Sequence, residues 1–102
     1  MRQSVFSDKE KDELLKTTVE TIHHFCYGNE SRKRYTFKIK DLQRMNDTLD
    51  ELSDALIRNF LVYLRDRKIV IPIKGSNPQI TRRYQIGFAK DELDDVINVV
   101  AG

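Results

Sequence analysis

The hydrophobic pattern of the chain changes its period between Leu64 and Ile69, and this change limits the folds that the chain can adopt. In "LIRNFLVYLRDRKIVIPI", apolar residues recur at helical spacing as far as Leu64, and an apolar strand-like run follows a short basic turn. We predict a helix over residues 53–67 that leads directly into a strand over 69–73. Pro72 lacks a backbone donor, which places this strand at the edge of a sheet.

A second run pairs with this strand. Tyr84, Ile86 and Phe88 alternate with polar residues or glycine, which is typical of a strand with one buried face. The intervening stretch "KGSNPQITRR" carries turn-forming residues in its first half and two arginines at its end. The two runs therefore predict an antiparallel β-hairpin with a basic tip.

Both ends of the chain are predicted to be helical. Ser7 and Glu10 form a capping-box pattern ahead of a 3.6-residue apolar stripe, so a first helix is expected over residues 8–27. Residues 91–100 predict a closing helix. Its apolar side carries Leu93, Val96, Ile97 and Val100. A helix this short is marginal alone, so its apolar side needs a surface to cover it.

The segment between these parts predicts a strand and a short helix. "RYTFKI" alternates so that Tyr35, Phe37 and Ile39 share one buried face. "KDLQRMN" predicts a brief helix with Leu42 and Met45 inward. The acidic "DTLDELSD" either continues this helix or forms a linking turn.

Composition narrows the class of protein. A chain of 102 residues with 39% hydrophobic residues forms one domain with a modest core. The lone Cys26 excludes an internal disulfide. No apolar run is long enough to span a membrane, and the start of the sequence lacks the apolar region of a signal peptide. These features predict a cytoplasmic protein without membrane contact.

The charges are unevenly distributed along the chain. The net charge is +4 over residues 30–46, −4 over 47–54 and +6 over 55–83, although the whole chain carries only +2. Alternating blocks of this kind fit a basic face framed by acidic segments. They also fit surface charges that are simply scattered by helix periodicity.

This order of elements resembles the winged helix-turn-helix family over roughly residues 8–88. The resemblance is carried by "LIRNFLVYLRDRKIVIPI" and by the strand "YTFK" ahead of the second helix. It implies an α+β fold with a three-helix core, a small antiparallel sheet whose β-hairpin is the wing, and an extra C-terminal helix over 89–101. Residues 1–102 would then form one domain, with the 53–67 helix as the recognition helix.

The resemblance implies double-stranded DNA as the partner. Arg58 and Asn59 are expected to read base edges, because Arg and Asn each make two hydrogen bonds to guanine and adenine. The other basic and polar candidates would contact phosphates or an adjacent groove. The full set of candidate DNA-binding residues is Arg32, Lys33, Arg34, Lys38, Lys40, Arg44, Arg58, Asn59, Arg65, Lys74, Asn77, Arg82 and Arg83. Each of them also fits an ordinary solvated surface.

Residues typical of catalysis or metal binding do not form a recognisable motif. His23 and Cys26 share a helical face, but a zinc site needs four ligands and the sequence has one Cys and two His. Asp50, Glu51 and Asp54 fit a capped helix start as well as an acidic cluster. No phosphate-binding loop or nucleophile motif is present. We therefore expect neither an enzyme nor a bound metal or cofactor.

The leading hypothesis is a small DNA-binding protein, either a transcriptional regulator or an initiator of phage or plasmid replication. Such a protein would associate with the nucleoid if it is bacterial or viral. The alternative is an interaction module that binds a protein partner through the acidic 47–54 segment or the terminal helix. The terminal helix can pack on helix one or on a second chain, and Val99, which lies off its apolar side, favours a homodimer.

Overall fold

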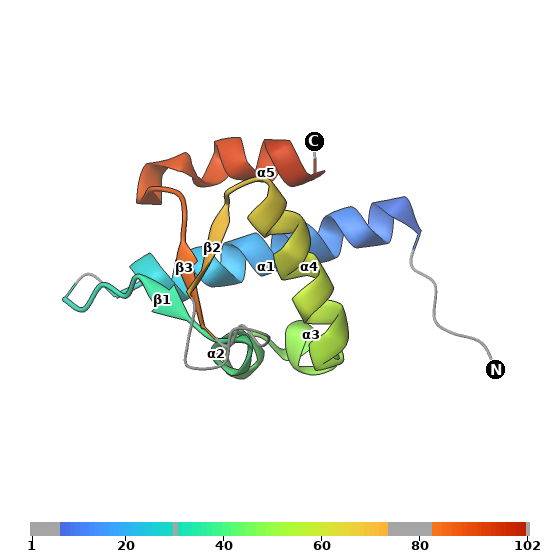
Figure 1. Ribbon diagram of the computed structural model, residues 1–102, viewed down its shortest axis with the longest axis horizontal. Helices are drawn as coiled ribbons and strands as arrows, with labels where there is room; N and C mark the ends of the chain where they lie inside the picture. The colour runs from blue at the N-terminus through green and yellow to red at the C-terminus, as the bar shows by residue number, and fades with distance from the viewer. Residues whose placement is uncertain (1–6, 30, 74–82, 102) are drawn as a thin grey trace.

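The computed structural model describes residues 7–29, 31–73 and 83–101, which form an α+β fold (Figure 1). In chain order the elements are α1 (Asp8–Tyr27), β1 (Thr36–Phe37), α2 (Ile39–Met45), α3 (Asp47–Asp50), α4 (Asp54–Asp66), β2 (Val70–Ile73), β3 (Arg83–Ile86), the 3₁₀ helix η1 (Lys90–Glu92) and α5 (Leu93–Ala101). The α+β class predicted from the sequence is confirmed. The long helix α1 runs through the middle of the molecule and is contacted by α5, α2 and the sheet.

The sheet is antiparallel, with β3 between β1 and β2. Pro72 lies in β2 opposite Tyr84, and its missing donor is tolerated because β2 is an edge strand in this sheet. Tyr84 and Ile86 point into the core, while Arg83 and Gln85 are exposed. The predicted antiparallel pairing and the alternation over Tyr84 and Ile86 are therefore confirmed, whereas Phe88, which was expected in the same strand, lies beyond the end of β3.

The start of α1 is a complete capping box. The Glu10 amide donates to Ser7 Oγ at 3.2 Å, and the Ser7 amide donates to a Glu10 carboxylate oxygen at 2.9 Å. These bonds satisfy two amides that have no partner within the helix. Two buried threonines on the same helix, Thr18 and Thr21, each donate to the carbonyl four residues earlier at 2.7 Å. The predicted bounds of this helix are confirmed.

The apolar side of α5 is covered by α1 of the same chain. Val96 and Val100 are buried in one cluster with Val19 and Ile22 of α1. A side-chain hydrogen bond also joins the end of α1 to the segment ahead of η1, since the Tyr27 hydroxyl donates to the Phe88 carbonyl at 2.6 Å. Helix one is thus the surface that covers this stripe, and α5 belongs to the same core as the rest of the domain.

The segment around β1 differs from the prediction. The strand contains only Thr36 and Phe37, and Tyr35 is 58% exposed instead of buried. The Lys38 amide donates to the Asp41 carboxylate at 2.9 Å. This bond starts α2 at residue 39, so Ile39 is buried as a helical residue and not as a strand residue.

The expected inward side of the second helix is correct for Leu42 and wrong for Met45, which is 42% exposed. Residues 47–50 neither continue α2 nor form a simple turn. Asn46 leaves the helical conformation and its side chain accepts from the Leu49 amide at 3.1 Å, which starts the separate one-turn helix α3. Leu49 is fully buried by this arrangement.

The turn from α4 into β2 has an unusual backbone. The Ile69 amide donates to the Leu64 carbonyl and the Lys68 amide to the Arg65 carbonyl, both at 2.9 Å, which is the Schellman pattern of a helix end. Lys68 therefore has a φ of 63°, in the left-handed region that glycine prefers. The turn sends the chain straight from the helix into the edge strand.

Candidate nucleic-acid interface

Basic side chains follow the chain from the end of α1, across β1, to α2. They are all exposed: Arg32, Lys33, Arg34, Lys38, Lys40 and Arg44. In Figure 1, β1 and α2 lie on one side of the molecule, away from the start of α1. The chain thus gathers six of the predicted phosphate-binding residues on neighbouring elements.

These cations have no carboxylate partner in the described part of the chain. The ion pair found there joins Arg65 to Asp66 at 3.1 Å, between exposed side chains. Arg34 lies over the ring of Phe25, 4.9 Å from its centroid, so its guanidinium has a preferred position on the surface. A surface with several cations and no paired carboxylates carries a local positive field.

The predicted recognition helix has the expected buried side and a mostly exposed opposite side. Ser53 caps it by accepting from the Leu56 amide at 3.2 Å. Ile57, Phe60, Leu61 and Leu64 are buried. Asn59 and Arg65 are exposed, as a base-reading or phosphate-binding role requires.

Arg58 differs from its neighbours because it is half-buried against the sheet. Burial raises the pKa of the Tyr84 hydroxyl, and the positive charges of Arg58 and Arg65 and a hydrogen bond with Arg58 oppose that rise. Arg58 thus has a partner within the fold and links α4 to β3. The base-reading role expected for Arg58 places it on the exposed side of the helix, and the structure instead shows it only partly exposed, because it bonds Tyr84 of the sheet.

The hairpin candidates divide into two groups. Lys74, Asn77 and Arg82 lie outside the described residues. Arg83 is exposed at the start of β3 and donates to Thr36 Oγ1 at 3.4 Å. Thr36 pairs with Gln85 in the register of β1 and β3. Arg83, which bonds Thr36, therefore lies next to β1 and to the exposed cations on either side of this strand.

Most of the acidic residues between α2 and α4 lie at helix starts. Asp47 and Asp50 lie in the first turn of α3, and Asp54 lies in the first turn of α4, where the helix dipole favours negative charge. Asp54 also accepts from Gln43 Nε2 at 3.0 Å, which ties α4 to α2. The acidic 47–54 segment, the alternative protein-binding segment, therefore also links α4 to α2.

The residues considered for metal binding contribute to packing. Cys26 is fully buried, and this burial raises the pKa of its thiol to about 11. His23 Nε2 donates to the Lys90 carbonyl at 2.9 Å, and its ring stacks on Phe88. Among the described residues, no group of three or more His, Cys, Asp or Glu side chains is placed to hold a metal ion.

Comparisons with protein-family models, with curated proteins and with solved structures found no match for this chain. The described helices include none that is both long and apolar enough to cross a lipid bilayer. The functional assignment therefore depends on the arrangement of the elements and on the surface that they present.

Proposed function

We propose that the chain is a winged helix-turn-helix protein that binds double-stranded DNA, with α4 as its recognition helix. The observation that carries the proposal is the set of six exposed cations between Arg32 and Arg44, which have no carboxylate partner among the described residues. The order of elements supports it, because α2, α3 and α4 lead into an antiparallel hairpin with β1 as a third strand.

The parts of this surface have different tasks. The cations of the connector and of α2 neutralise phosphates and contribute affinity for any duplex. Asn59 and Arg65 lie on the exposed side of α4 and read base edges in the major groove. Arg58 is half-buried and links α4 to β3 through Tyr84, so it positions the recognition helix as well as lying on the side of α4 that faces the DNA. A transcriptional regulator or a replication initiator would use such a surface.

Binding of a random duplex at increasing salt tests the proposal. We expect binding at low salt and a steep loss of affinity as salt rises, because each phosphate contact releases a counterion. Lys33→Ala should weaken binding to all duplexes and reduce the salt slope by about one. Lys9→Ala is the matched control, since Lys9 is also exposed but lies in the first turn of α1, at the opposite end of that helix from β1.

Specificity needs a separate measurement. Selection of preferred sites from a random pool should give a different profile for Asn59→Ala, and Arg58→Ala should also change it. Tyr84→Phe controls for the second variant, because it removes the hydrogen bond to Arg58 and keeps the guanidinium. Absence of duplex binding at low salt would contradict the proposal and favour a protein partner at the acidic 47–54 segment.

A further inference from the structure

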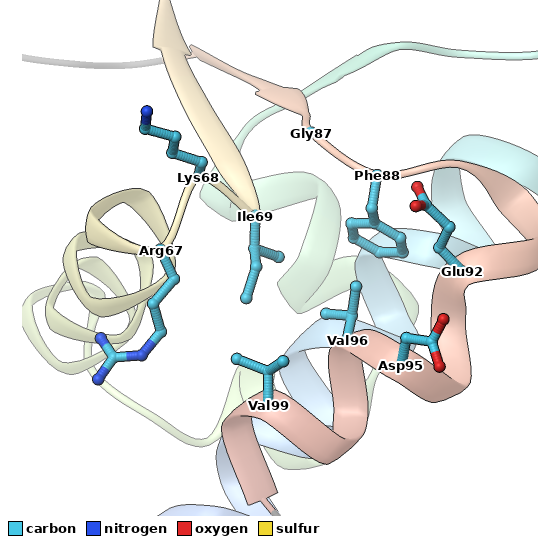
Figure 2. A pocket seen from close by; sticks show the side chains of 9 residues that line it. All are labelled: Arg67, Lys68, Ile69, Gly87, Phe88, Glu92, Asp95, Val96 and Val99. Atoms are coloured by element: carbon cyan, nitrogen blue, oxygen red, sulfur yellow. The ribbon is translucent and has the colours of Figure 1, made fainter.

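A groove lies between the turn that joins α4 to β2 and the outer side of α5, with a volume of about 250 Å³ (Figure 2). Its floor is apolar and contains Ile69, Phe88 and Val96, and the exposed Val99 lines its edge. Arg67 and Lys68 form one wall, and Glu92 and Asp95 form the opposite wall. The groove therefore combines an apolar centre with one basic and one acidic rim.

Val99 is the feature that a solvated surface does not explain. It lies outside the stripe that packs on α1 and is 61% exposed, more than any other large hydrophobic residue of the described chain. A single exposed valine is ordinary. Here it adjoins the buried floor residues Ile69 and Val96, so the apolar surface is continuous from the core to the rim.

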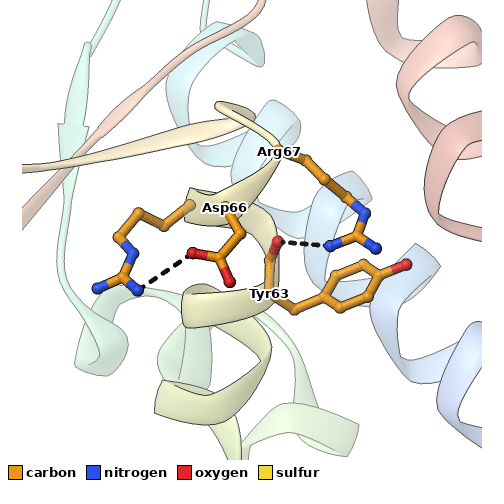
Figure 3. Close-up of polar contacts among 4 residues, drawn as sticks. Tyr63, Asp66 and Arg67 are labelled. Atoms are coloured by element: carbon orange, nitrogen blue, oxygen red, sulfur yellow. Dashed lines mark hydrogen bonds and ion pairs between the residues drawn. The ribbon is translucent and has the colours of Figure 1, made fainter.

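Two of the charged side chains are held in position. The guanidinium of Arg67 lies 3.5 Å from the centroid of the Tyr63 ring and donates to the Tyr63 carbonyl at 3.2 Å (Figure 3). A Glu92 carboxylate oxygen accepts from the Ala89 amide at 2.7 Å. Among the described residues no ion pair crosses the groove. Positioned charges lose little conformational entropy when a partner binds.

The two walls determine which partner fits. A partner with charge of one sign would be attracted by one wall and repelled by the other. A second copy of this chain, rotated by a two-fold axis that runs along the groove, places its basic wall over the acidic wall of the first copy and its acidic wall over the basic wall. The same rotation brings the two Val99 side chains together above the apolar floors.

We propose that this groove is the interface of a symmetric homodimer. This inference is independent of DNA binding, and it differs from a dimer through the main stripe of α5, which α1 covers. Lys68 of each protomer faces Asp95 of the other, and Val99 lies at the centre. The interface is isologous, so every contact occurs twice and each substitution acts twice.

Sedimentation equilibrium of the full chain between roughly 1 and 100 µM at low salt tests the apolar centre. We expect a monomer–dimer equilibrium that Val99→Asp weakens by at least about tenfold, because two charges then meet at the centre of the interface. Val62→Asp is the matched control: Val62 is also exposed, but lies on α4 outside the groove, and its variant should dimerise normally.

A charge exchange tests the two-fold arrangement. Lys68→Glu and Asp95→Lys should each weaken the dimer, since each places like charges opposite one another twice. An equimolar mixture of these two variants should form a heterodimer of near-normal affinity, because both contacts are again complementary. Asp94→Lys, which makes the same change one residue away from the groove lining, should have little effect.

The proposal is overturned if the chain sediments as a monomer at about 100 µM, a concentration at which a specific dimer of useful affinity would be populated. It is also overturned if Val99→Asp and Val62→Asp behave alike, or if the mixed charge variants fail to associate. Circular dichroism of each variant checks that the fold is intact. Duplex binding by the Val99→Asp variant is measured separately, so loss of the dimer and loss of DNA binding are distinguishable.

Discussion

Lys68 occupies a backbone conformation that suits glycine, and replacing it should stabilise the protein. Its φ of 63° is imposed by the two Schellman hydrogen bonds that end α4. A residue with a Cβ atom is strained in this region because Cβ approaches the neighbouring carbonyl oxygen. Lys68→Gly removes that strain and leaves both hydrogen bonds in place.

The expected gain is a difference between two opposing effects. Relief of the left-handed conformation is worth about 1–2 kcal/mol, whereas glycine in the unfolded chain has extra conformational freedom that costs about 0.5–1 kcal/mol. From the middle of each range, the net stabilisation is about 0.75 kcal/mol. For a domain of this length such a change raises Tm by roughly 2–8 °C. The lysine side chain is exposed, so its loss removes little packing within one chain. Because Lys68 also lies in the proposed dimer interface, unfolding is measured at a concentration at which the chain is monomeric.

Thermal and urea unfolding measure this change, with Lys40→Gly as the matched control. Lys40 is an exposed lysine inside α2, where the same substitution removes helix propensity and should destabilise the domain by about 1 kcal/mol. Lys68→Asn should fall between the parent and Lys68→Gly, because Asn tolerates the left-handed region. If Lys68→Gly lowers stability as Lys40→Gly does, the Schellman assignment of this turn is wrong.

Three further predictions concern the packing and the titratable groups. Gly87→Ala should destabilise the domain by roughly 2 kcal/mol or more in urea unfolding, because its Cβ would lie 2.5 Å from the Lys68 carbonyl oxygen and 2.9 Å from that of Ile69. The Ser7 amide and hydroxyl lower the pKa of Glu10. The capping box therefore adds stability at neutral pH, and this stability is lost as pH falls through the lowered pKa. In Ser7→Ala, the free energy of unfolding should depend less on pH in the acid range. Burial raises the pKa of the Cys26 thiol to about 11, so folding should lose stability as pH rises from about 9 towards 11, and thiol reagents should react only as fast as the domain opens.

The elements with a strong hydrophobic period could be predicted from the sequence. The bounds of α1, the buried side of α4 and the alternation of β3 follow from side chains that repeat at fixed spacing and from the caps Ser7 and Ser53. These signals are local, because a capping side chain bonds an amide two or three residues away. Tertiary contacts did not have to be known in advance.

The region from Tyr35 to Met45 could not be predicted in the same way. Alternation over six residues indicated a strand there, whereas the bond from the Lys38 amide to Asp41 started a helix within the same residues. The strand pattern and the helix-start pattern overlap in this short segment. The pairing of β1 with β3 determines that the strand ends at Phe37. Tyr35 remains exposed because its carbonyl, not its ring, joins the sheet by accepting from the Ile86 amide.

The partners of charged side chains explain why the candidate site could be predicted only in part from the sequence. Glu10, Asp41 and Glu92 each accept from a backbone amide at a helix start, and Asp54 accepts from Gln43. Carboxylates are thus used for capping, whereas the exposed cations of residues 32–44 meet no carboxylate among the described residues. The capped carboxylates are partly neutralised by the dipoles that they bind.

A net charge of +2 consequently understates the positive field beside β1 and α2. Arg58 lies on the side of α4 that helical periodicity predicts to be exposed, but it is half-buried because it bonds Tyr84 of β3. Helical periodicity gives the direction of a side chain, but only the packing of the neighbouring element gives its partner. Under the proposed function, Asn59 is therefore the better candidate for reading a base, because it is exposed and Arg65 already pairs with Asp66.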